Sequence, residues 1–161
     1  MIKYIFRVDW VKRMTGLTFA LFCVLLVAAV GQFCLKIDFT WYYALNKPAF
    51  MPTPGGFTLM TSAVYMFSAA LITRLVVGRH FFPSMILLAV AGMLSAVYLF
   101  VMFRMKNPYA ACVVMLCVWA VSFVTLVRFM FKDRWCVALY LPVFLFNSFC
   151  TVLAVWLAFS N

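Results

Sequence analysis

The residues best suited to chemistry in this chain lie in one segment, WYYALNKPAFMPTPGGF, which runs from Trp41 to Phe57. Aromatic side chains surround a single lysine, Lys47, and three prolines stiffen the backbone, Pro48, Pro52 and Pro54. Aromatic rings can stack on a flat apolar molecule, and a lysine ammonium can pair with a carboxylate. The segment therefore predicts a rigid lid over a flat hydrophobic ligand that carries an acidic group.

A simpler interpretation treats Trp41, Tyr42 and Tyr43 as aromatic residues at the headgroup level of a membrane. That interpretation explains neither the prolines nor the position of Lys47 among rings. Long aromatic loops between regular elements are more often functional than connecting. We therefore interpret residues 36–56 as a ligand lid.

The rest of the chain offers few groups for catalysis or metal binding. It has no Glu, one His at position 80, and six cysteines that form no CxxC pair. No motif for a catalytic serine, a zinc protease or a phosphate-binding loop is present. We expect a protein that is not an enzyme, with no catalytic residues, no metal site and no required cofactor.

Polar side chains also occur inside the apolar segments. Ser95 and Tyr98 lie three residues apart, on one helical face, and Asn147 and Ser148 follow Pro142. Such groups either join helices by hydrogen bonds or line an apolar pocket with a few polar contacts. The pattern leaves both roles open, helix joining being the simpler.

The composition indicates the elements that must position these groups. The chain has 161 residues, 69% of them hydrophobic and only 10% charged, with a mean hydropathy of +1.14. A soluble domain has about 25% charged residues, so we expect an all-α integral membrane protein, a single domain over residues 1–161. About 20 apolar residues cross a bilayer as a helix, which predicts an up-down bundle of five transmembrane helices: Gly16–Leu35, Phe57–Val77, Phe81–Phe103, Pro108–Val127 and Cys136–Ser160.

The basic residues predict an orientation. The formal net charge is +10, and the basic residues cluster at the ends of apolar segments, where they meet anionic headgroups rather than nucleic acid. Nine lie on the side of the N-terminus and four on the side of the lid. The positive-inside rule then places the N-terminus in the cytoplasm, and the lid and the C-terminus outside. We expect the first segment to be a retained helix rather than a cleaved signal peptide.

The lid motif resembles the first loop of the translocator protein family, also called tryptophan-rich sensory proteins or peripheral benzodiazepine receptors. The positions in register are Trp41, Tyr42, Leu45, Lys47, Pro48, Pro52, Phe57 and Tyr65 in the first part, and Pro108, Trp119, Thr125, Pro142, Ser148, Phe149, Leu153 and Asn161 in the last two spans. The resemblance covers about three-quarters of the chain, from Trp41 to the end.

The resemblance implies a five-helix bundle, often a homodimer, with a ligand cavity beneath the first loop. The family's ligands are porphyrins and haem-like tetrapyrroles, sterols and synthetic benzodiazepine-site drugs. On this basis we expect the ligand-binding residues to be Trp41, Lys47, Pro48, Phe50, Pro52, Phe57, Tyr65, Ser95, Tyr98, Trp119, Phe146 and Cys150. We expect membrane lipid and a hydrophobic small molecule, porphyrin-like or haem-like, as binding partners.

The chain departs from the family pattern at several aromatic positions. Where the family has tryptophan, this chain has Phe50, Thr61, Tyr98 and Phe146. Since indole is the group most easily oxidised by an excited porphyrin, these changes favour ligand binding over the porphyrin breakdown proposed for bacterial members. The sequence thus predicts a receptor or transport-type membrane protein, the alternative being a small structural or regulatory subunit that docks a partner protein.

Overall fold

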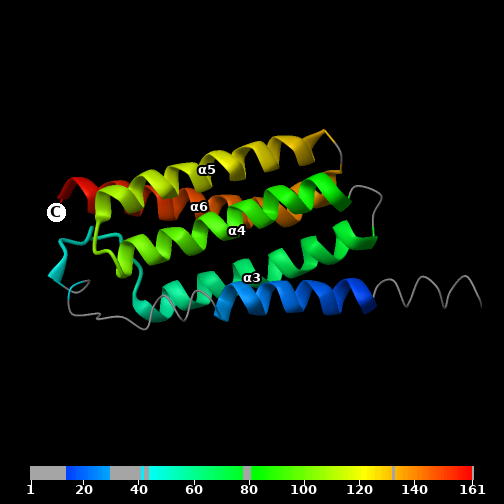
Figure 1. Ribbon diagram of the computed structural model, residues 1–161, viewed down its shortest axis with the longest axis horizontal. Helices are drawn as coiled ribbons and strands as arrows, with labels where there is room; N and C mark the ends of the chain where they lie inside the picture. The colour runs from blue at the N-terminus through cyan, green and yellow to red at the C-terminus, as the bar shows by residue number, and fades with distance from the viewer. Residues whose placement is uncertain (1–13, 30–40, 42–43, 78–80, 132, 161) are drawn as a thin grey trace, which may run out of the picture.

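The described residues form helices and connecting turns, with no strand among them. The structure, a computed structural model, describes residues 14–29, 41, 44–77, 81–131 and 133–160 (Figure 1). A helix Met14–Ala29 is followed by α3 (Pro54–Val77), α4 (Phe81–Phe103), α5 (Pro108–Met130) and α6 (Arg134–Ser160). The last four are long and apolar enough to cross a membrane. The predicted fold class, an all-α membrane bundle, is confirmed.

Three helix ends lie beyond the predicted apolar segments. α3 begins at Pro54 rather than Phe57, because Pro suits the first turn and Thr53 Oγ1 accepts a hydrogen bond from the Gly56 N–H at 3.3 Å. α5 continues to Met130, three residues past the prediction, and α6 begins at Arg134, two residues before it. For the first predicted span, Gly16–Leu35, the helix is described to Ala29, and residues 30–35 lie outside the described residues.

The helices alternate in direction along one long axis (Figure 1). One end of the bundle holds residues 44–53 and the C-terminal end of α6, and is called the loop end below. The other end holds Arg74 and Asp133, and is called the Arg74 end. A turn at the loop end joins α4 to α5; Asn107 caps α5 by accepting from the Ala110 N–H at 3.1 Å, and Lys106 has φ of 52°.

The order of the helices around the bundle follows from their contacts. α5 has extensive interfaces with α6 and α4, and α3 packs on α6. The helix Met14–Ala29 reaches α3 through Gly16, where an added Cβ would lie 3.4 Å from Val76 Cγ1. It reaches α4 at Gly92, where an added Cβ would lie 3.8 Å from Val27 Cγ2. Small residues allow these close approaches, and the order is Met14–Ala29, α3, α6, α5 and α4.

Buried side chains divide the interior into clusters at two depths. Toward the Arg74 end, Leu71, Leu75, Phe129, Tyr140 and Val143 form one cluster with Cys136. Toward the loop end, two adjoining clusters share Tyr98, and their buried members are Met115, Val118, Cys150 and Ala154 in one, and Val101, Met102, Ala111 and Leu157 in the other. Four predicted site residues belong to these loop-end clusters or pack against them: Trp41, Tyr98, Phe146 and Cys150.

The helix order predicts a cross-link. An ideal Cβ on Gly16 lies 3.5 Å from Val76 Cβ, within the range of about 3.5–4.5 Å that a disulfide needs. We expect Gly16→Cys with Val76→Cys to form an intramolecular disulfide on mild oxidation, detected by peptide mass spectrometry. The matched pair Gly16→Cys with Leu75→Cys should not, because Leu75 faces the internal cluster. Equal cross-linking of both pairs would contradict the helix order.

Candidate ligand site

The described part of the lid is fixed to the bundle by a turn and by aromatic contact. Pro48 is buried, and its carbonyl accepts a hydrogen bond from the Met51 N–H at 3.0 Å. Phe50 is 51% exposed and places its ring edge on Trp156 of α6, with centroids 6.1 Å apart and planes at 80°. This edge-to-face geometry is a favourable one for aromatic pairs. The lid is therefore attached to the outer side of α6, while Tyr42 and Tyr43 lie outside the described residues.

Trp41 lies at the loop end, over the helix ends. Together with Leu45 and Tyr98 it packs against the cluster of Val101, Met102, Ala111 and Leu157. These residues come from α4, α5 and α6, so the predicted lid covers the ends of three helices.

A second group of predicted residues meets one layer deeper. Phe57, in the first turns of α3, has its ring 5.7 Å from that of Phe146 on α6. Phe146 and Tyr98 both pack against the cluster that contains Cys150. Five predicted residues are thereby linked through packing contacts, and Tyr98 belongs to both layers: Trp41, Phe57, Tyr98, Phe146 and Cys150.

Trp119 is not part of this group. It lies at the outer seam of α5 and α6, where it stacks on Phe123 at 5.7 Å with planes at 13° and has its ring 6.1 Å from Phe144. Its indole Nε1–H donates to Ser148 Oγ at 3.0 Å, and the residue is 36% exposed. The structure thus gives Trp119 a helix-joining position.

The remaining predicted residues are half-buried on their own elements. Lys47 and Pro52 are in the lid, and Tyr65 lies on α3. Ser95 lies on α4 and donates its hydroxyl hydrogen to the Ala91 carbonyl at 2.8 Å, so its oxygen stays available as an acceptor.

Sequence reasoning missed an apolar groove next to the lid. It has a volume of about 440 Å³, lies near the C-terminal end of α6, and is lined by Thr151, Val152, Val155, Trp156, Phe159 and Ser160. The partner of Asn147 was missed as well: its Nδ2–H donates to Ser122 Oγ on α5 at 2.8 Å. In the sequence, Ser122 is a serine in the middle of an apolar span. Many serines that only join membrane helices occur in the same setting, so nothing marks Ser122 as the partner of Asn147.

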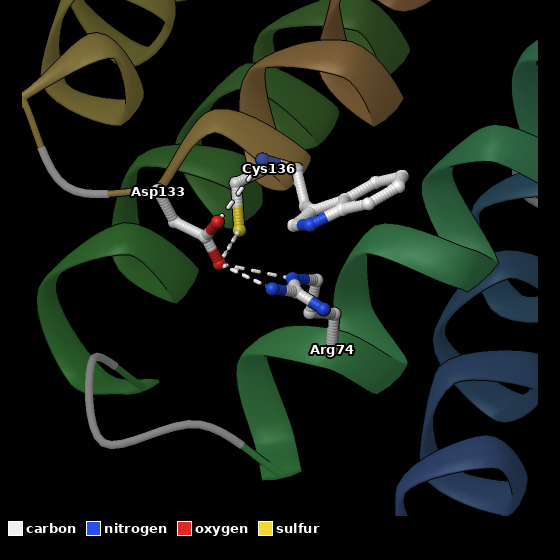
Figure 2. A network of polar contacts seen from close by, with 4 residues as sticks. Arg74, Asp133 and Cys136 are labelled. Atoms are coloured by element: carbon white, nitrogen blue, oxygen red, sulfur yellow. Dashed lines mark hydrogen bonds and ion pairs between the residues drawn. The ribbon is translucent and has the colours of Figure 1, made fainter.

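The Arg74 end carries a polar network that joins α3 to α6 (Figure 2). Arg74 donates from Nη2 and Nε to Asp133 Oδ2, at 2.8 and 2.9 Å. Asp133 also caps α6, because its Oδ1 accepts the Trp135 N–H at 3.0 Å, and the Cys136 thiol lies 3.6 Å from Oδ2. Partial burial of Asp133 raises the pKa of its carboxyl, but the Trp135 N–H and the Arg74 guanidinium outweigh it and leave the pKa below its ordinary value.

The residues linked at the loop end are mainly apolar and aromatic. Within residues 14–29, 41, 44–77, 81–131 and 133–160, no three His, Cys, Asp or Glu side chains are placed to hold a metal ion. The linked residues offer rings, a thiol in an apolar setting and a phenol.

The model of the TspO/MBR family matches residues 19–159, most of the chain. The chain belongs to the TspO/MBR family. The predicted family is thereby confirmed, and membership, together with the four long apolar helices, indicates an integral membrane protein of a ligand-binding or transport type. Among curated proteins, none matches the chain.

The Asp133 network predicts a pH dependence at the acid end. A carboxyl whose folded pKa is lowered contributes stability above its unfolded pKa and loses it as pH falls through the folded pKa. The ordinary value is 3.8, so we expect the thermal midpoint in detergent to be insensitive to this group above about pH 5 and to fall below about pH 4. The measurement is circular dichroism melting across that range.

Two variants separate the parts of the network. Asp133→Asn keeps a capping oxygen and should lose only the ion pair, at most about 1 kcal/mol, because the pair is partly exposed. Asp133→Ala should cost about 1 kcal/mol more, because the cap is lost as well. Equal stability of the two variants would contradict the capping role.

Proposed function

We propose that this TspO/MBR protein binds a flat, hydrophobic, porphyrin-like ligand in the loop-end half of the bundle. The observation that carries the proposal is the linkage of Trp41, Phe57, Tyr98, Phe146 and Cys150. These residues come from the lid, α3, α4 and α6, so a molecule held among them would contact the lid and three of the helices. Small-molecule sites are mostly apolar and aromatic in this way, with few polar groups.

The chemistry of the lid favours a ligand with an acidic edge. Lys47 lies on the half-buried part of the lid, between Trp41 and Phe50 in sequence. An ammonium near rings suits a planar molecule whose carboxylates face the headgroup region while its apolar body enters the bundle. Tetrapyrroles with propionate groups have this division of polarity.

Binding, rather than chemical conversion, is the activity we propose. The family tryptophans are replaced by Phe50, Thr61, Tyr98 and Phe146 in this chain, and Trp119 lies at the outer seam. The groups linked around the proposed site include no general base. We propose a receptor or carrier that needs no cofactor of its own, functions in lipid and forms a homodimer.

The orientation is proposed from the two ends of the bundle. Arg74, Arg128 and Arg134 lie toward the Arg74 end, while Lys47, Arg104 and Lys106 lie toward the loop end. When the basic residues of the N-terminal segment and of the connections are included, the sequence places nine Lys and Arg residues on the side of the Arg74 end and four on the side of the lid. We propose that the Arg74 end faces the cytoplasm and that the lid faces outward.

A porphyrin titration tests the proposal. In detergent micelles or nanodiscs, protoporphyrin IX should bind saturably with a Kd in the micromolar range. The shift of its Soret absorbance measures the binding. Trp41→Ala with Phe146→Ala should weaken binding by about tenfold to a hundredfold, because two large apolar contacts are lost. Absorbance of the ligand is used because Trp41 itself contributes to protein fluorescence.

The matched control is Phe123→Ala. Phe123 is also aromatic and 46% exposed, but it stacks on Trp119 at the outer seam. Its loss should leave porphyrin affinity unchanged. If both variants bind as the unaltered protein does, the site assignment is wrong. If the unaltered protein shows no saturable binding and instead co-purifies with a stoichiometric protein partner, the subunit alternative replaces the proposal.

A further inference from the structure

We infer that Asn147, held by Ser122, is a polar contact point at the deep end of the ligand site, and that it selects porphyrins with a hydrogen-bonding group on the edge opposite their carboxylates. This inference rests on the proposed function. It adds a residue outside the predicted ligand set and a chemical preference that the aromatic residues alone would not give.

The position of Asn147 on α6 points inward. Val143 and Cys150, four residues before it and three after it, lie on the same helical face and are buried at 9% and 8% exposure. Val143 belongs to the cluster at the Arg74 end and Cys150 to a cluster at the loop end. Asn147 therefore lies at the boundary between the two halves of the interior, directly below the linked aromatic residues.

The Asn147 side chain is fixed by a hydrogen bond that uses only part of its hydrogen-bonding capacity. Its Nδ2 donates to Ser122 Oγ at 2.8 Å, and Ser122 is fully buried. The Tyr140 hydroxyl lies within reach of Ser122 and Thr125 on the far side, toward the Arg74 end. Among the described residues, the bond to Ser122 uses one of the two N–H groups of the amide. The second N–H and the carbonyl oxygen provide a donor and an acceptor.

Asn147 is only half-buried, although its neighbours Val143 and Cys150 on the same face are buried. Asn147 is therefore more accessible than the residues one turn above and below it on this face. An amide that is fixed by a buried serine and partly uncovered, between two apolar clusters, can contact a ligand that enters from the loop end.

A second hydrogen bond between the same helices provides the contrast. Trp119 and Ser148 also join α5 to α6, at 3.0 Å, but Trp119 lies on the outer seam with Phe123 and Phe144. Both pairs hold the two helices together. Only the Asn147–Ser122 pair lies beneath the proposed site, so the two roles can be separated.

Three porphyrins that differ on one edge test the inference. Protoporphyrin IX, mesoporphyrin and haematoporphyrin share the ring and both propionates, and carry vinyl, ethyl or 1-hydroxyethyl groups on the opposite edge. If the propionates face Lys47, that edge reaches Asn147. The quantity compared is the preference for haematoporphyrin, which is the Kd of mesoporphyrin divided by the Kd of haematoporphyrin. We expect this preference to be about threefold to tenfold larger in the unaltered protein than in Asn147→Leu. Asn147→Ala, whose side chain fills less volume, should abolish the preference too. This variant tests the inference if Asn147→Leu does not fold.

Ser148→Ala is the matched control. It removes the other α5–α6 hydrogen bond and should leave the haematoporphyrin preference intact, even if it lowers the melting temperature. An unchanged preference in both Asn147 variants, or equal binding of haematoporphyrin and mesoporphyrin by the unaltered protein, overturns the inference while leaving porphyrin binding established. Failure of all three porphyrins to bind saturably overturns the proposed function itself, and the inference with it.

Discussion

The antiparallel pairing of α5 and α6 supports most of the other contacts in the described bundle. α4 packs on α5 and α3 packs on α6, so the positions of both depend on this pair. Apolar burial cannot hold two helices together in lipid, because lipid tails are as apolar as leucine. The pair is instead joined by close packing and by two cross-helix hydrogen bonds, Trp119 to Ser148 and Asn147 to Ser122. The lid then attaches to α6 through Phe50 and Trp156.

The pattern of apolar segments was sufficient to predict the fold class, since a backbone in hydrocarbon must form helices. Helix ends were less predictable, because caps such as Thr53 and Asp133 are polar residues just outside the apolar segments. The family, too, could be predicted, because the lid motif combines rings, prolines and a lysine at fixed spacing, and the TspO/MBR match over residues 19–159 confirms it.

The side-chain contacts inside the bundle were harder to predict for a geometric reason. Most residues of a membrane helix are apolar whichever way they face, so periodicity does not distinguish the interior side from the lipid side. Trp119 shows the problem: the family resemblance placed it among the expected ligand residues, and in the structure its ring stacks on Phe123 and its indole donates to Ser148. Pairs that depend on helix register, such as Ser122 with Asn147 and Arg74 with Asp133, lie 25 and 59 residues apart. Nothing local in the sequence connects them.

The two ends of the bundle are held by different kinds of force. At the Arg74 end, a directional ion pair and a helix cap fasten α3 to the start of α6 (Figure 2). At the loop end, the contacts between α3 and α6 include the ring pair of Phe57 and Phe146, which tolerates sliding and tilting. Between α3 and α6, the directional contacts of Asp133 therefore define the register of the two helices at the Arg74 end, whereas the ring pair at the loop end defines little more than their separation.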